Sequence, residues 1–168
     1  MLKIRRAVPA DCGKIARIQV RGWQAAYRGI LPDDYLDGLD AGRRLVVWQQ
    51  FVLDGVGTML VAEVGAEVVG FCHLIPSRDS DADHAAEIAA IYIDPDHLRR
   101  GHGTLLCKAA CVSAREQDFR RLTLWVLRDN ASGRDFYTKM GLLPDGTTKV
   151  EERPGFTLEE VRYSMELR

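Results

Sequence analysis

The stretch IDPDHLRRGHGTLLCKAA (residues 93–110) places a proline, two adjacent arginines and a Gly-His-Gly turn directly before a run rich in leucine and alanine. The preceding run AEIAAIYI is apolar and typical of a buried strand that ends at Asp94-Pro95. After the turn, apolar residues recur at three- and four-residue spacing, which predicts a helix to about Gln117. We therefore expect a strand, a glycine-rich turn and a helix in immediate succession.

A glycine-rich turn at the start of a helix points free backbone N–H groups and the positive end of the helix dipole at one place, which suits a phosphate. Gly101 and Gly103 let the backbone approach an anion closely, and Arg99 and Arg100 add charge at the edge. Taken alone, the pattern also fits a flexible loop with solvated charges. No Lys follows Gly103 as in a Walker A loop, and Leu106 stands where a Rossmann fingerprint needs its third glycine, which argues against ATP in a P-loop and against NAD.

The rest of the chain predicts elements in the order β-α-α-β-β-β-α-β-α-β-β. TMLVAEV and EVVGFCHLI flank Gly65-Ala66, which suits a type II′ hairpin, and the two last strands pair across Pro154-Gly155. A loop with a short helix is expected in GILPDDYLDGLD, and another helix between Asn130 and Gly141. This order predicts an α/β (α+β) fold, in which about four helices flank a mixed, mostly antiparallel sheet of six to seven strands.

The length of 168 residues predicts a single domain over residues 1–168 with one core. Because 23 Lys and Arg balance 24 Asp and Glu, the net charge of -1 gives no reason to expect nucleic acid or an anionic membrane as a partner. No signal peptide or membrane-spanning run is found, so we expect a cytoplasmic protein. The four cysteines lack CxxC spacing and are expected to be small buried hydrophobic residues rather than a metal or redox pair, and no metal is expected.

Two segments together resemble a known family. The run IYIDPDHLRRGHGTLL, followed by LWVLRDNASGRDFYTKMGL, is similar to the acetyl-coenzyme A (acetyl-CoA) binding core of the GNAT superfamily of N-acetyltransferases. The resemblance is strong from Glu87 to Leu142 and extends more loosely, through the element order and the R-A-x-P-A-D beginning, over the whole chain. The chain departs from the family pattern at Leu98, where Gln or Arg is usual, at Gly133, where Ala is usual, and at Leu142, where Phe is usual.

The resemblance implies which residues bind acetyl-CoA. The strand would offer backbone groups to the pantetheine arm, the turn would wrap the pyrophosphate, and two residues of the later motif would complete the site. Each part also has an alternative role. The strand would then make only ordinary strand pairs, and the turn would be a solvated loop. Asn130 would be a helix N-cap, and Tyr137 would be a core residue. The implied cofactor residues are Ile91, Tyr92, Ile93, Leu98, Arg99, Arg100, Gly101, His102, Gly103, Thr104, Asn130 and Tyr137.

The resemblance also implies two catalytic residues. Tyr137 matches the family tyrosine that hydrogen-bonds the coenzyme A sulfur and protonates the thiolate. A primary amine with a pKa of about 10 is protonated at pH 7, so a base must remove a proton before the nitrogen attacks. Glu87 resembles in position the strand glutamate that acts as this base in the histone-acetyltransferase branch, and its apolar strand is expected to desolvate it. The alternative is an exposed residue at a strand end.

Other polar and aromatic residues near these motifs allow two interpretations each. Asp79, Asp81 and Asp83 form, with His84, an acidic loop that either attracts a cationic amine or is simply solvated. Three aromatic residues lie in the region that forms the acceptor wall in the family, and they fit a hydrophobic core equally well. These residues are Trp23, Tyr27 and Tyr35.

The leading hypothesis is an N-acetyltransferase that moves an acetyl group from acetyl-CoA directly to an amine. A non-catalytic module of the same fold that binds coenzyme A is the alternative, and an acyltransferase for a longer acyl donor is a third hypothesis. The acceptor, a small-molecule or peptide amine, cannot be identified from the sequence, and a homodimer remains open.

Overall fold

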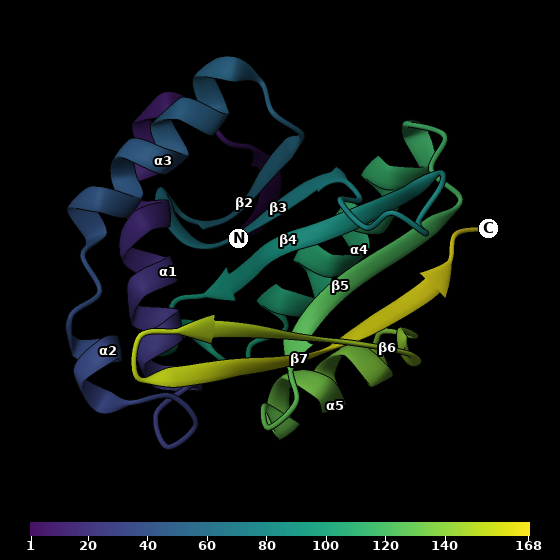
Figure 1. Cartoon of the computed structure of the whole chain (residues 1–168). Helices are drawn as coiled ribbons and strands as arrows, with labels where there is room; N and C mark the ends of the chain where they lie inside the picture. Colours follow the sequence, from purple (N-terminus) through teal and green to yellow (C-terminus); the bar gives the residue numbers. More distant parts are fainter.

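The predicted order of elements is present in the computed structural model, which describes residues 1–168 (Figure 1). The short helix expected in residues 29–40 is α2, and it brings the number of α-helices to five. The strands are β1 (Leu2–Arg6), β2 (Thr58–Val64), β3 (Glu67–Pro76), β4 (Ala85–Ile93), β5 (Arg121–Leu127), β6 (Leu143–Arg153) and β7 (Phe156–Glu166). The helices are α1 (Cys12–Ala26), α2 (Asp33–Asp37), α3 (Ala41–Asp54), α4 (His102–Glu116) and α5 (Ala131–Lys139).

All seven strands form one sheet in the order β1-β2-β3-β4-β5-β7-β6. Every neighbouring pair is antiparallel except β4 and β5, which run parallel because α4 connects them. The predicted mixed, mostly antiparallel sheet is therefore confirmed. The structure adds that β7 lies between β5 and β6, so the last hairpin joins the sheet through its second strand.

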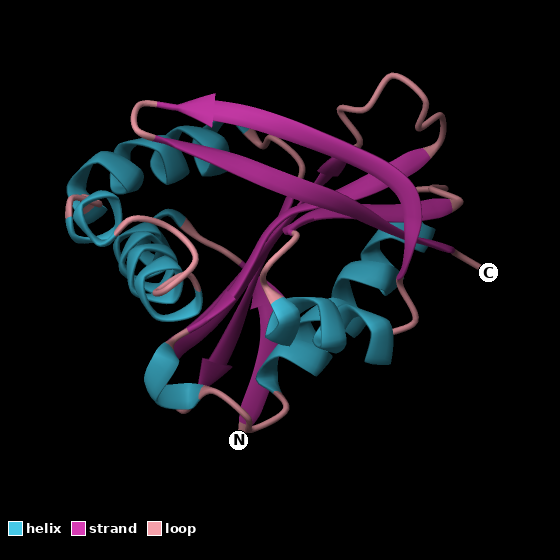
Figure 2. Cartoon of the chain, turned by 60° about the horizontal axis from the view of Figure 1, so that its bottom comes forward, coloured by secondary structure: helices cyan, strands magenta, loops and turns pink.

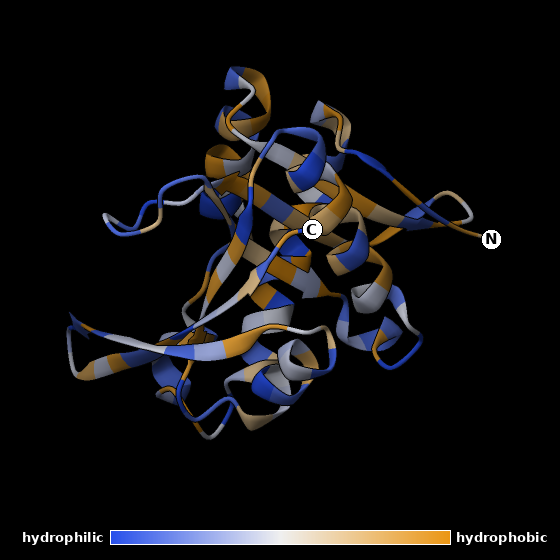
Figure 3. Cartoon of the chain, turned by 90° about the vertical axis from the view of Figure 1, so that its right-hand side faces the viewer, coloured by the Kyte–Doolittle hydropathy of each residue, from blue (hydrophilic) through white to orange (hydrophobic).

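Helices cover both faces of the sheet, as predicted (Figure 2). On one face α1 and α3 bury residues such as Ile18 and Trp48 against Phe71. On the other face α4 buries Leu106 and Ala110 against the strands, and α5 packs at its edge. Figure 3 shows how hydrophobic and hydrophilic residues alternate along the helices. Each layer therefore follows from the apolar periodicity of its own helix.

The four cysteines are buried and unpaired, as the sequence predicts. No group of three or more His, Cys, Asp or Glu side chains could hold a metal ion. No helix is long and apolar enough to cross a membrane.

The parallel pair β4 and β5 separates after four residues. Ala85–Ile88 pairs with Arg121–Leu124, and no pairing follows. At the same level the register of β4 against β3 shifts, so that Ile88 and Ala90 face consecutive residues of β3 and Ala89 is the extra residue of a β-bulge. A bulge bends its strand and disturbs the ladder locally, which accounts for the parting. The edge of β4 from Ala89 to Ile93 that faces β5 is left without a strand partner.

One residue of β7 is charged and buried. Arg162 is only 3% exposed. Its guanidinium donates to Asp81 at 2.7 and 2.8 Å, to Asp145 at 2.7 Å and to Asp79 at 3.2 Å. The hydrogen bond from Arg162 lowers the pKa of Asp81 to about 2. Asp79 and Asp81 of the acidic loop therefore bind Arg162, while the side chain of Asp81 remains 60% exposed.

Replacing Arg162 by Met tests this ion cluster. At pH 7 we expect the variant to unfold at a lower urea concentration than the wild type, because Asp79, Asp81 and Asp145 lose the buried guanidinium that they share. The pKa of Asp81 is lowered in the folded state, so this stabilisation is present above pH 3.8 and is lost as the pH falls through about 2. The urea midpoints of the wild type and the variant should therefore converge as the pH is lowered from 7 to 2.

The matched control is Arg128→Met, which removes an arginine whose ion pair with Glu159 is half exposed. If Arg162→Met were as stable as this control at pH 7, the ion cluster around Arg162 would not stabilise the fold as described.

Candidate active site

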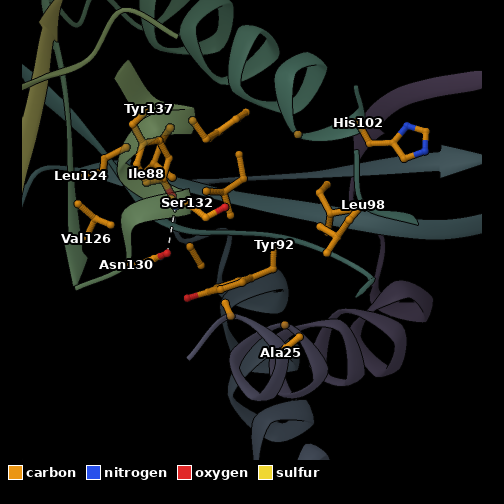
Figure 4. Close-up of a pocket in the computed structure, with 18 of the residues that line it drawn as sticks. Ala25, Ile88, Tyr92, Leu98, His102, Leu124, Val126, Asn130, Ser132 and Tyr137 are labelled. Carbon is orange, nitrogen blue, oxygen red and sulfur yellow. Dashed lines mark hydrogen bonds between the residues drawn. The ribbon is translucent and has the colours of Figure 1, made fainter. Parts of the chain in front are cut away.

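A cavity of about 550 Å³ opens where β4 and β5 part (Figure 4). Its walls come from the unpaired end of β4, the end of β5, the C-terminal half of α1 and the N-terminal ends of α4 and α5. In Figure 4, Ile88, Leu124 and Tyr137 form one end, while Tyr92 lies between them and Ala25 of α1. The cavity is thus a direct result of the strand separation.

Eleven of the twelve predicted cofactor residues line this cavity, and Arg100 is the exception. The side chain of His102 is directed away from the other labelled residues in Figure 4, so only its backbone is placed toward the cavity. The side chain of Tyr92 lies in the cavity, although only its backbone was expected to contribute. The structure therefore brings the two sequence motifs together around one space.

The turn between β4 and α4 leaves seven consecutive backbone N–H groups, from Leu98 to Thr104, without an acceptor in the chain. The first backbone hydrogen bond of α4 is donated by Leu105 to the carbonyl of Gly101 at 3.1 Å. Such a run of free donors at the positive end of a 15-residue helix binds an anion well. Leu98, the departure from the family pattern, is 51% exposed and contributes its amide like its neighbours.

The backbone at Gly101 requires glycine. This residue caps α4 with φ of +82°, in the left-handed region that a side chain disfavours. Arg99 also has a positive φ of 59°, which lets the chain curl twice within three residues. The two positive φ angles produce the concave row of amides.

The α5 wall supplies two polar side chains. Asn130 accepts a hydrogen bond from the amide of Gly133 at 3.0 Å, so it caps the helix, and it also lines the cavity. The Tyr137 hydroxyl forms no hydrogen bond within the chain, and burial raises the pKa of this phenol well above its usual value. Tyr137 therefore remains protonated at neutral pH and has a proton available to donate.

A smaller cavity of about 130 Å³ lies on the other side of the bulge. It shares five lining residues with the larger cavity: Tyr27, Ile88, Ala89, Tyr92 and Trp125. Its charged residues are Arg78, Glu87, Lys149 and Glu160. Two spaces of unequal size therefore meet at the point where β4 and β5 part.

Glu87 lines the smaller cavity and is only 2% exposed, so an exposed strand-end residue is the wrong interpretation. Arg78 donates from Nη2 to one carboxylate oxygen at 2.6 Å, and from Nε and its backbone N–H to the other at 3.2 Å. The hydrogen bond to Glu87 raises the pKa of Arg78 above its usual value. The carboxylate is therefore held in one orientation by a partner from the preceding loop.

The aromatic residues divide between wall and core. Trp23 and Tyr27 line the smaller cavity, and the Tyr27 hydroxyl hydrogen-bonds that of Tyr92 at 3.1 Å. Tyr35 lies outside both cavities and packs on Phe156 with ring centroids 4.7 Å apart. Trp23 and Tyr27 thus lie where an acceptor wall was expected, while Tyr35 belongs to the core.

Several residues at these cavities had no signal in the sequence. Arg78 lies in a polar turn, and Lys149 and Glu160 lie in the last hairpin, whose position in the sheet depends on the strand order. Gly22 of α1 lies so close to the Tyr92 ring that a Cβ there would be 3.0 Å from it. Helical spacing does not reveal such a contact between two elements.

The comparison with known proteins agrees with this geometry. The profile of the acetyltransferase (GNAT) family matches residues 23–142. The chain belongs to the GNAT family of acetyltransferases. The predicted family, fold and N-acetyltransferase class are confirmed.

Two curated proteins and one solved structure illustrate the likeness. The chain is 30% identical to a probable N-acetyltransferase of Mycobacterium tuberculosis over 150 residues, which is 88% of this chain and 83% of the relative. It is 28% identical to the uncharacterized N-acetyltransferase YuaI of Bacillus subtilis over 132 residues, 79% of this chain and 75% of the relative. The structure of the acetyltransferase YncA from Salmonella typhimurium, solved with acetyl-CoA, has a TM-score of 0.75 at 22% identity and covers 100% of this chain and 95% of its own.

The environment of His102 predicts a measurable titration. Burial, together with the nearby His97 and Arg100, lowers the pKa of His102 below 6.5. As the pH falls, His102 is therefore protonated in the unfolded state before it is protonated in the folded state. The folded state consequently loses stability below pH 6.5. A two-dimensional NMR titration of the imidazole, assigned with a His102→Gln variant, should give a midpoint below 6.5. A midpoint at or above 6.5 would contradict this environment.

Proposed function

We propose that residues 1–168 form one N-acetyltransferase domain that binds acetyl-CoA in the larger cavity and an amine in the smaller one. The observation that carries this proposal is the meeting of the two cavities at the bulge, with Tyr137 on one side and Glu87 on the other. Direct transfer needs both substrates at one point, and the shared wall supplies that point.

The residues around the larger cavity fit acetyl-CoA. The seven free amides from Leu98 to Thr104 suit the pyrophosphate, with Arg99 at the cavity edge. The unpaired edge of Ile91 to Ile93 offers backbone groups to the pantetheine amides. Asn130 keeps a free amide nitrogen beside the same space. When bound, acetyl-CoA supplies a thioester carbonyl and a thiolate leaving group.

Glu87 is proposed as the general base. An ammonium must lose a proton before its nitrogen can attack a carbonyl, and a carboxylate beside the amine can accept that proton directly or through a water. Arg78 keeps the Glu87 carboxylate in place, so Arg78 is a positioning residue. The apolar neighbours Ile88 and Ala89 limit solvation around it.

Tyr137 is proposed as the general acid. Its hydroxyl is protonated and unpartnered, and the residue lines the larger cavity at the end nearest Ile88 and Leu124. It can therefore give its proton to the departing sulfur. Free backbone N–H groups at the parted strand would polarise the carbonyl.

The non-catalytic alternative would need the amide turn but neither Glu87 nor Tyr137. Family membership and the positions of Glu87 and Tyr137 in two adjoining cavities favour the enzyme. We also propose a cytoplasmic location, because four buried, unpaired cysteines suit a reducing compartment.

Substitution of the two proposed catalytic residues tests the mechanism. We expect Glu87→Gln and Tyr137→Phe each to lower kcat by roughly 100-fold, the usual contribution of a positioned acid or base. The measurement is thiol release from acetyl-CoA with an accepted amine. The Glu87→Gln loss should be smaller at high pH, where more of the amine is already neutral.

Matched controls are Glu159→Gln and Tyr35→Phe, both outside the two cavities. Full turnover in both catalytic-site variants would refute the proposed chemistry.

The amide turn is tested by Gly101→Ala. A side chain at φ of +82° costs about 1–2 kcal/mol and shifts the row of amides, so the KM for acetyl-CoA should rise roughly tenfold. Gly155→Ala, at φ of +86° in the last hairpin, is the control for backbone strain away from the site. Equal KM values for the two variants would show that the turn does not bind coenzyme A.

A further inference from the structure

Charge is distributed unevenly with depth in the smaller cavity. Its two carboxylates are sheltered, since the side chains of Glu87 and Glu160 are 2% and 20% exposed. Its two cations lie at the rim, since the side chains of Arg78 and Lys149 are 66% and 42% exposed. The interior therefore suits a positive group, and the rim suits a negative one.

We propose that the acceptor is an amine that also carries a carboxylate, with the charge pattern of a free α-amino acid. This inference rests on the proposed function, because it assigns the amine to the smaller cavity. The amine enters toward Glu87, and the carboxylate stays at the rim against Arg78 and Lys149. A volume of about 130 Å³ accommodates this charged head and little else, so the remainder of the acceptor lies outside.

Both rim cations have N–H groups that form no hydrogen bond within the chain. Arg78 uses Nε and Nη2 on Glu87, while its Nη1 has no partner in the chain. Lys149 has one ion pair, to Glu160 at 3.4 Å, and its ammonium lies 4.2 Å from the centre of the Trp125 ring. A guanidinium and an ammonium placed in this way can both bind one carboxylate.

The aromatic wall helps to keep Lys149 at the rim. The Lys149 ammonium lies over the face of Trp125, a favourable contact between a cation and an indole ring. This contact holds the cation where the proposed carboxylate would lie.

The charges disfavour a polyamine. A polyamine needs several unpaired carboxylates, one near each ammonium. Here Glu87 is paired with Arg78, Glu160 with Lys149, and Asp79 and Asp81 of the acidic loop with Arg162. The smaller cavity is therefore neutral as a whole and complementary to a zwitterion.

The decisive experiment compares matched acceptors with the wild-type enzyme. Thiol release from acetyl-CoA is measured for the twenty common L-α-amino acids, their α-carboxamides, their decarboxylated amines and spermidine. We expect at least one free amino acid to exceed its own carboxamide and amine by roughly tenfold or more in kcat/KM, the effect of a charge-assisted contact at a partly exposed site. Equal or better turnover of carboxamides, simple amines or spermidine overturns the proposed acceptor class.

The same experiment separates this inference from the function on which it rests. Acetylation of amines without a preference for a carboxylate contradicts only the acceptor class. Binding of acetyl-CoA by calorimetry, with no thiol release from any amine, contradicts the proposed enzyme and with it the acceptor class.

Two variants at the rim test which residues bind the carboxylate of the acceptor. Lys149→Gln and Arg78→Gln should each reduce the ratio of kcat/KM for acid over carboxamide at least threefold, roughly the effect of one exposed charged contact. Lys149→Gln is the cleaner test, because Arg78 also holds Glu87. The control is Arg153→Gln, which removes a charge from the same hairpin outside the cavity. A ratio unchanged in both rim variants places the carboxylate contact elsewhere and overturns the assignment.

Discussion

The separation of β4 from β5 after Ile88 is the constraint on which the rest of the site depends. Two parallel strands that stayed paired would leave no space between them and no free edge on β4. The bulge at Ala89 bends β4 away, while α4 and β7 hold the flanking parts of the sheet in place. One irregular residue thereby creates the larger cavity, the unpaired strand edge and the junction with the smaller cavity.

Charge is then fixed around this opening by ion pairs. Arg78 holds Glu87 from the preceding loop, and Arg162 binds Asp79 and Asp81 of that loop from the last strand. The position of Arg162 depends on β7 lying beside β5. The base of the proposed reaction and the rim of the acceptor cavity are consequently set by tertiary structure rather than by a local motif.

The sequence predicted what depends on local chemistry. Apolar periodicity located the helices and strands, the paired glycines predicted the amide turn, and the two motifs together indicated the family. The sequence could not predict the position of Arg78, Lys149 or Glu160, because a polar turn and a solvent-exposed hairpin have the same residue pattern whether or not they face a cavity. The burial of Arg162 could not be predicted either, because it requires three aspartates that only the folded chain brings together.

Amide hydrogen exchange can detect coenzyme A at the turn between β4 and α4. The N–H groups of residues 98–104 should exchange rapidly in the free protein, because none has an acceptor, and become strongly protected when coenzyme A is added. The N–H groups of the hairpin turn around Gly155 should exchange at the same rate in both states. Protection of residues 98–104 in the free protein, or rapid exchange that coenzyme A leaves unchanged, would contradict the account.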